Sequence, residues 1–100
     1  MIKAVIIDDE SSCRDALELL LKEFCPQVEL VGMAASLPEG INLVKEKNPE
    51  LVFLDVELKN HLGFKLFESF PNPEFQVIFS TAHEKYALQA IKTSCLEYLL

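Results

Sequence analysis

The sequence lacks several features that mark particular classes of protein. Its cysteines, Cys13, Cys25 and Cys95, are odd in number and show no CxxC spacing, so they indicate neither a disulfide framework nor a zinc site. We expect them to be reduced, partly buried thiols. No apolar run approaches the roughly 20 residues of a membrane-spanning helix. The first residues also lack the apolar stretch and cleavage site of a secretory signal, which predicts a cytoplasmic location.

Positive charge is scarce as well. Lysine and arginine together number 9, against 16 aspartate and glutamate residues, which gives a formal net charge of −7. This balance argues against nonspecific binding of nucleic acid or anionic membrane, and it favours cations or basic partners. The chain shows no internal repeat, low-complexity segment or linker. Its 100 residues, half of them hydrophobic, suit one globular domain over residues 1–100.

Two short apolar runs are distinctive because each ends in carboxylates. Residues 4–7 run into Asp8 and Asp9, and residues 51–54 run into Asp55. Four consecutive bulky, partly β-branched residues suit a strand that is buried on both faces of a parallel sheet. The carboxyl ends of the strands form the ligand crevice of an open α/β sheet. We therefore expect an acidic cluster at this edge.

Strand-like and helix-like segments alternate along the chain. The predicted strands are residues 3–8, 28–34, 50–55, 75–79 and 96–100, and the predicted helices are residues 12–24, 36–48, 64–70 and 83–93. Capping-box patterns at Ser12-Cys13-Arg14-Asp15 and Ser36-Leu37-Pro38-Glu39 mark the first two helix starts. Gly32 either weakens the second strand or admits a close neighbour. The alternation predicts a parallel α/β sheet with helices on both faces, without fixing the strand order.

The predicted acidic cluster favours metal-dependent chemistry. Three carboxylates in one crevice repel one another unless protons or a cation intervene, and oxygen ligands alone select a hard ion such as Mg²⁺. An aspartate beside Mg²⁺ can act as a nucleophile toward phosphorus and form an aspartyl phosphate. Thr81, at the end of the next predicted strand, can donate a hydrogen bond to a phosphoryl oxygen.

Each of these residues also has a purely structural interpretation. Asp9 alone suits the N-terminus of a helix, Asp55 alone suits a turn after a strand, and Thr81 alone suits a helix cap. Their joint placement at the ends of consecutive strands is what favours the functional interpretation.

Several short motifs follow one another along the whole chain. They are Ile6-Ile7-Asp8-Asp9-Glu10, Phe53-Leu54-Asp55-Val56, Gly63 and Ser80-Thr81-Ala82. Together they resemble the receiver domain of bacterial two-component response regulators. The resemblance implies a doubly wound, flavodoxin-like parallel sheet of strand order 2-1-3-4-5. The implied site consists of Asp55 as phosphoacceptor, Asp8, Asp9, Asp55 and the backbone carbonyl of Glu57 as Mg²⁺ ligands, Thr81 as switch hydroxyl and Tyr98 as switch aromatic.

Residues 79–90 and 96–100 are further similar to receivers of the LytR/AlgR type, which usually precede a LytTR DNA-binding domain. This resemblance implies a signalling switch that a sensor histidine kinase phosphorylates, with at most slow self-dephosphorylation and no other enzymatic activity. It also implies an N-terminal fragment, because the lysine after the fifth strand, the fifth helix and the output domain are not in the sequence. An apolar face without that helix predicts self-association. DNA would be contacted only through the output domain, and a membrane not at all.

Other interpretations stay open on the residues alone. Asp55-Val56-Glu57 loosely matches the DxD motif of haloacid-dehalogenase-like phosphatases, although its second acid is glutamate and the chain is short for that fold. A nucleotide-binding module fits less well, because the first strand leads into acidic residues and not into a Gly-rich loop. A receiver-like dimerisation module that is never phosphorylated also fits. His83 and Tyr98 suit a solvated helix start and a half-buried strand as well as a phosphoryl site.

Overall fold

The computed structural model describes residues 1–55, 57–58 and 61–80 of the chain. Its elements are β1 (Ile2–Ile7), α1 (Ser11–Phe24), β2 (Val28–Ala34), α2 (Leu37–Lys47), β3 (Leu51–Asp55), β4 (Glu57–Leu58), β5 (His61–Leu62), the 3₁₀ helix η1 (Gly63–Glu68) and β6 (Gln76–Ser80). The predicted helix over residues 83–93 and the predicted strand over residues 96–100 lie outside the described residues.

Four parallel strands form the main sheet in the order β2-β1-β3-β6. Because β6 is the fourth predicted strand, this order is the 2-1-3-4 that the family resemblance implies. The two central strands are the ones that carry the apolar runs, and residues 4–7 and 51–54 are all buried. The prediction that both strands are covered on both faces is therefore confirmed.

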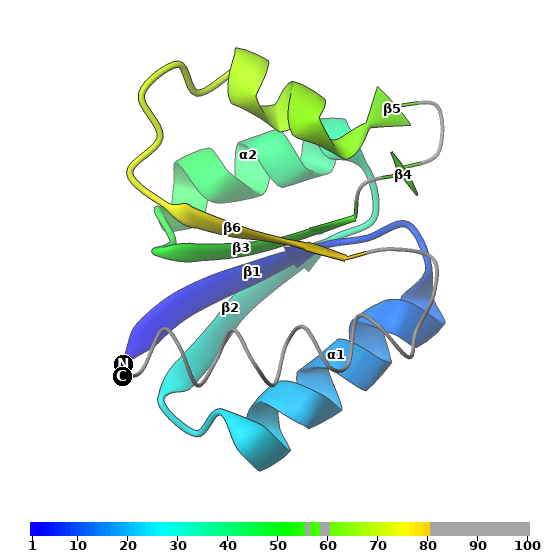
Figure 1. Ribbon diagram of the computed structural model, residues 1–100, viewed down its shortest axis with the longest axis vertical. Coiled ribbons are helices and arrows are strands. Elements are labelled where there is room, and N and C mark those ends of the chain that lie inside the picture. Colours follow the sequence, from blue (N-terminus) through cyan, green and yellow to red (C-terminus); the bar gives the residue numbers. More distant parts are fainter. Residues whose placement is uncertain (56, 59–60, 81–100) are drawn as a thin grey trace.

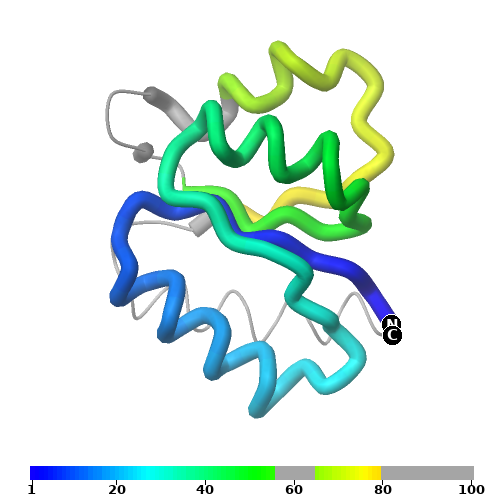
Figure 2. The backbone as a smooth tube through the Cα atoms, turned by 180° about the vertical axis from the view of Figure 1, so that it is seen from behind, coloured from blue at the N-terminus to red at the C-terminus, as the bar shows by residue number. Residues whose placement is uncertain are grey.

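Helices lie on both faces of this sheet, which gives three layers (Figure 1). On one face α1 packs through Leu17 into a core that includes Phe53. On the other face Val44 of α2 and Leu66 of η1 pack with Val52. Figure 2 shows the same layers from behind, with α2 and η1 together on the side opposite α1. None of the helices described is long and apolar enough to cross a membrane.

The first helix begins earlier than its capping-box pattern predicts. Glu10 is the N-cap residue, and its carbonyl already accepts a hydrogen bond from the Arg14 N–H at 3.1 Å. Ser12 therefore lies inside α1, and in the described part of the chain no side chain caps this helix start, so the prediction of a cap at Ser12 is wrong. Leu17 faces the core, whereas Phe24 at the end of the helix stays 48% exposed.

The second helix begins as its sequence predicts. Ser36 is the N-cap, and its Oγ accepts a hydrogen bond from the Glu39 N–H at 3.3 Å. The Glu39 carboxylate in turn accepts from the N–H of Ala35 at 3.4 Å. The helix ends before Asn48, which takes the left-handed conformation with φ of 48°. Both ends of α2 are thus fixed by local chemistry that can be recognised in the sequence.

The segment after β3 contains strands outside the ranges predicted from the sequence. The short strands β4 and β5 pair with each other in antiparallel fashion. The helix that follows is a 3₁₀ helix, and Phe70 lies beyond its end, so the predicted helix over residues 64–70 is too long. Phe70 instead meets Phe75 edge-on, with 5.4 Å between ring centroids.

The cysteines also depart from expectation. Cys25 is fully buried at the C-cap of α1 and is disulfide-bonded. The expectation of reduced thiols is therefore wrong for Cys25. Cys13 keeps its thiol, which donates a hydrogen bond to Glu10 Oε2 at 3.4 Å.

Candidate metal centre

The pairing of β1 with β3 brings the predicted carboxylates to one edge of the sheet. Ile7 pairs with Leu54 at the carboxyl ends of the two parallel strands, so the residues that follow, Asp8 and Asp55, are neighbours. Asp55 alternates with Leu54, whose side chain belongs to the core on the α2 face. Because successive side chains in a strand point to opposite faces, Asp55 turns to the α1 face. Asp9 follows Asp8 in the turn that leads into α1.

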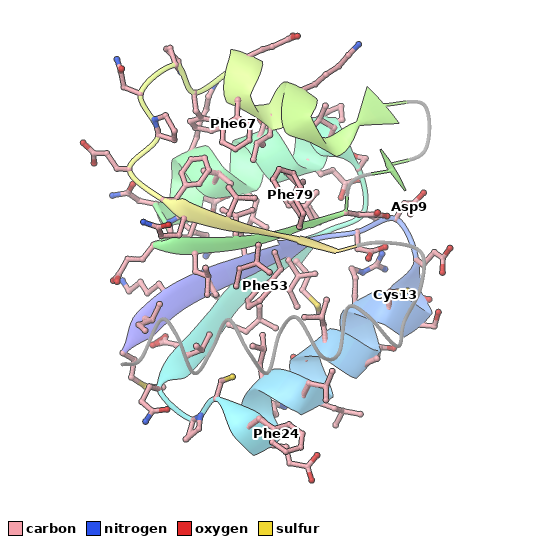
Figure 3. All side chains as sticks on the ribbon, in the orientation of Figure 1. Asp9, Cys13, Phe24, Phe53, Phe67 and Phe79 are labelled. Atoms are coloured by element: carbon pink, nitrogen blue, oxygen red, sulfur yellow. The ribbon has the colours of Figure 1, made fainter. Side chains whose placement is uncertain are left out.

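Three carboxylates converge at this edge. Oxygens of Asp8, Asp9 and Asp55 all lie within 4.8 Å of one another, and among the described residues neither histidine nor cysteine joins this group. Figure 3 shows Asp9 where β1 runs into α1, at the carboxyl end of the sheet. Asp8 is buried, and the other two are partly exposed. The acidic cluster that the sequence predicts is present in the fold.

Asp8 is held by hydrogen bonds from three directions. Its N–H donates to the carbonyl of Ala34 at 3.0 Å, and its Oδ1 accepts from the N–H of Glu10 at 3.0 Å. Its own carbonyl accepts from Nη1 of Arg14 at 2.8 Å. A carboxylate that bonds the N–H two residues further on closes an Asx-turn. Only 5% of Asp8 is exposed, so its position is set by the protein and not by solvent.

Burial raises the pKa of the Asp8 carboxyl above its ordinary value of 3.8, because desolvation disfavours the charged form. The hydrogen bond from the Glu10 N–H opposes this and lowers the pKa. The charges of Asp9 and Glu10 raise it further, and the Arg14 guanidinium lowers it. The cluster therefore holds more negative charge than its surroundings compensate, which suits the binding of a cation.

Two members of this site, Arg14 and Glu10, were not predicted from the sequence. Glu10 acts through its backbone N–H, which no side-chain pattern reveals. Arg14 lies in the first turn of α1, where a cation opposes the positive end of the helix dipole. An arginine placed against that preference, four residues after the acidic run that ends at Glu10, is the signal that points to it.

The donor set fits Mg²⁺. This ion takes oxygen ligands at about 2.1 Å in octahedral geometry, so two ligands on opposite sides of it lie roughly 4.2 Å apart. The carboxylate oxygens here span at most 4.8 Å, so small side-chain adjustments suffice for direct binding. Oxygen donors alone disfavour the softer metals that prefer imidazole and thiolate.

The other predicted site residues are placed only in part. Glu57 begins β4 two residues beyond Asp55, and the use of its backbone carbonyl as a ligand stays a prediction. Ser80 pairs with Asp55 in the sheet, so β6 ends at the edge that carries the carboxylates. The predicted switch and neighbour residues Thr81, His83 and Tyr98 lie outside the described residues.

A parallel sheet of order 2-1-3-4 with an acidic cluster at its carboxyl edge defines a flavodoxin-like fold with a metal-type site. The model of the response regulator receiver domain family matches residues 4–100. The chain therefore belongs to this family of two-component signalling domains, and the resemblance stated from the motifs is confirmed.

Similar proteins agree with this assignment. The chain is 35% identical over 103 residues to the sensory transduction protein LytT of Bacillus cereus and 33% identical over 102 residues to the transcriptional regulatory protein BtsR of Escherichia coli. Both matches cover 100% of this chain, which spans only 41% and 42% of those relatives. The signal receiver domain of the response regulator NarL from Mycobacterium tuberculosis has the same fold, with a TM-score of 0.74 at 20% identity over 98% of this chain and 92% of that one.

Proposed function

We propose that residues 1–100 form the phosphoacceptor domain of a two-component response regulator, in which Asp55 receives a phosphoryl group from a sensor histidine kinase. The observation that carries this proposal is the convergence of Asp8, Asp9 and Asp55 within 4.8 Å at the carboxyl edge of a receiver-family sheet. These carboxylates, with the backbone carbonyl of Glu57, hold Mg²⁺.

The surroundings of the carboxylates support Asp55 as the nucleophile. Asp8 is buried, and its Oδ1 is engaged by the Glu10 N–H, so a large phosphodonor has little access to it. Asp55 is partly exposed at the end of a central strand, where an incoming donor can reach it. Asp9 stands beside the start of α1 and shares the ligand role with Asp8.

The transfer itself is a substitution at phosphorus. A carboxylate oxygen of Asp55 attacks the phosphorus, and the bond between phosphorus and the phosphohistidine nitrogen of the kinase breaks. The nitrogen keeps the electron pair and takes up a proton, which leaves a neutral imidazole and an aspartyl phosphate. Mg²⁺ in this site supplies neutralisation of the charge on the phosphoryl oxygens. Asp8 and Asp9 would hold the ion beside the end of β3, where Asp55 lies.

The response is a switch in the rest of the regulator. Thr81 takes up a hydrogen bond with the phosphoryl group, and Tyr98 turns inward when Thr81 moves. The longer relatives, named as sensory transduction and transcriptional regulatory proteins, support a LytTR DNA-binding output in the cytoplasm. The domain dephosphorylates itself slowly at most, and phosphorylation shifts dimerisation or DNA binding elsewhere in the regulator.

Phosphorylation by a small donor tests this function. The full-length protein is incubated with Mg²⁺ and acetyl phosphate, and the product is analysed by intact mass and by peptide mapping. We expect one acid-stable, base-labile phosphoryl adduct on Asp55 that requires Mg²⁺. The Asp55→Asn protein should lack the adduct, whereas Asp15→Asn, which removes an exposed carboxylate from α1, should retain it.

The other outcomes identify the competing functions. Continuous hydrolysis of phosphate esters, without an accumulating adduct, would indicate a phosphatase. A protein that takes up no phosphoryl group at all, while folded, would indicate a dimerisation module that is never phosphorylated. Either result would overturn the proposal.

A further inference from the structure

Within the described residues, the positively charged side chain of Arg14 contacts the backbone of the metal centre. Its Nη1 donates a hydrogen bond of 2.8 Å to the carbonyl of Asp8, six residues earlier in the chain. The same carboxylate-bearing residue receives the Glu10 N–H on its Oδ1 at 3.0 Å. The Arg14 side chain, which belongs to α1, therefore stabilises the start of the turn between β1 and α1 through its hydrogen bond to the Asp8 carbonyl.

The helix geometry explains why Arg14 can do this. The Arg14 N–H closes the first turn of α1 on the carbonyl of Glu10 at 3.1 Å, so the residue is anchored at the helix start. Side chains in a helix lean toward its N-terminus, which directs the Arg14 stem back over the turn. Arg14 is half-buried as a whole residue, and its Nη1 reaches the Asp8 carbonyl.

We propose that Arg14 is a positioning residue that holds the β1–α1 turn in the conformation in which Asp8, Asp9 and Asp55 converge on one metal ion. This inference rests on the proposed metal centre. It assigns to Arg14 no contact with the ion or the phosphoryl group. Arg14 acts through the backbone of Asp8, and the position of Asp9, the next residue, depends on the same peptide unit.

A role through charge alone predicts the opposite effect. A guanidinium hydrogen-bonded to Asp8, one of the three converging residues, competes electrostatically with a divalent ion. Its removal would therefore tighten metal binding if charge were its only contribution. Loss of positioning weakens binding, because groups that orient metal ligands contribute about 10–100-fold to metal affinity. The sign of the change therefore separates the two explanations.

The test compares three substitutions in the full chain. Arg14→Met removes the cation and its donors but keeps a long side chain, and Arg14→Lys keeps the charge and one donor. Lys22→Met is the matched control, because Lys22 lies in the last turn of the same helix, roughly 12 Å along its axis, and is exposed. Mg²⁺ affinity is measured by calorimetric titration with MgCl₂ at fixed ionic strength, and urea unfolding establishes that each protein is folded.

We expect Arg14→Met to bind Mg²⁺ about tenfold more weakly than the wild type, Lys22→Met to stay within about twofold, and Arg14→Lys to fall between them. Binding by Arg14→Met that equals or exceeds that of Lys22→Met overturns the inference. If Arg14→Met does not fold, Arg14→Lys decides the matter: weaker binding than Lys22→Met supports positioning, and equal binding overturns it.

A second measurement does not depend on the metal. Amide exchange of the Glu10 N–H in metal-free protein reports whether the turn around Asp8 stays closed. We expect this amide to exchange severalfold faster in Arg14→Met than in Lys22→Met. If the wild type binds no Mg²⁺ but the Glu10 amide exchanges faster in Arg14→Met, the proposed metal centre is refuted and the positioning role of Arg14 is not. Unchanged exchange together with unchanged Mg²⁺ affinity would refute the positioning role alone.

Discussion

At the scale of single residues, the candidate site sets burial against charge. Asp8 is almost completely buried, yet it lies within 4.8 Å of two further carboxylates. The Glu10 N–H and the Arg14 guanidinium offset part of the cost of this charge, and burial together with the neighbouring acids still raises the Asp8 pKa. In the metal-free domain, the buried charge of Asp8 therefore lowers the free energy of unfolding, although the proposed function requires this carboxylate.

We predict that Asp8→Asn stabilises the metal-free protein at neutral pH, because the amide oxygen can still accept the Glu10 N–H without bringing a buried charge. Since the folded pKa of Asp8 is raised, the folded state holds this proton more tightly than the unfolded state does. The contribution of Asp8 to wild-type stability then falls as the pH rises from 3.8 through the folded pKa, and it stays lower above that value. Each tenfold difference in proton affinity corresponds to about 1.4 kcal/mol.

Urea unfolding in the presence of a chelator, from about pH 4 to pH 8, measures this effect across the range in which a raised carboxyl pKa falls. The difference between Asp8→Asn and wild type should grow through that range and then become constant. Asp15→Asn, which alters an exposed carboxylate on α1, serves as control and should show no such growth. Parallel pH profiles for wild type and Asp8→Asn would contradict the prediction.

The residues of the site differ in how far the sequence reveals them. Asp8, Asp9 and Asp55 were predictable because apolar strands of known direction deliver their last residues to one edge. Arg14 and the Glu10 N–H were not, because their contacts depend on the shape of the turn around Asp8. A turn of a given sequence can adopt several backbone conformations, and tertiary contacts select one of them.

At the scale of elements, two copies of one motif had different outcomes. The capping box at Ser36 is confirmed by the hydrogen bond from the Glu39 N–H to Ser36 Oγ. The cap that the same pattern predicts at Ser12 is not formed. The Glu10 carbonyl accepts the first helical hydrogen bond, so Ser12 lies inside α1. The motif shows only that a serine side chain is able to cap a helix. The start of α1 is set by the hydrogen bonds that hold Asp8 in place.

The packing of α2 on β1 leads to a second prediction. A Cβ on Gly40 would lie 2.7 Å from Cδ1 and 2.9 Å from Cγ2 of Ile7, which is fully buried next to Asp8. We expect Gly40→Ala to lower the free energy of unfolding by about 1–2 kcal/mol, since overpacking outweighs the gain of about 1 kcal/mol in helix propensity.

Gly32→Ala is the control for this change. Its Cβ would lie 2.6 Å from Cδ1 of Leu43, the end of a half-buried side chain that can move aside. We expect this substitution to cost less than about 0.5 kcal/mol, since the strand also gains from losing a glycine. Equal losses in urea unfolding for the two variants would show that the contact with Ile7 is not the limiting one.

At the scale of the whole molecule, the class of fold was predictable and the strand order was not. Alternating segments require a parallel sheet with helices on both faces, as observed. The order 2-1-3-4 came from the family resemblance, because periodicity carries no information on which strands are neighbours. The β4–β5 pair was missed for a related reason: two-residue strands have too few side chains to show a pattern.

The last prediction concerns the whole domain in the presence of the ion. An ion that binds the folded state alone adds stability by mass action, so Mg²⁺ at ten times its Kd should raise the free energy of unfolding by about 1.4 kcal/mol. For a domain of this size that corresponds to roughly 6 °C in Tm. Thermal unfolding followed by circular dichroism, with MgCl₂ replaced by NaCl at equal ionic strength, measures the shift.

The control for this shift is Asp9→Asn, which removes one of the three converging carboxylates but no buried charge. Its Tm should respond to Mg²⁺ much less than that of the wild type, whereas Asp15→Asn should respond fully. A wild-type Tm that does not change with Mg²⁺ would mean that the three carboxylates are not a metal centre. An Asp9→Asn response as large as that of the wild type would place the ion elsewhere on the acidic surface. Metal affinity and fold stability are linked here because the residues at the carboxyl edge of β1 and β3 are also the ones that converge at the proposed ion site.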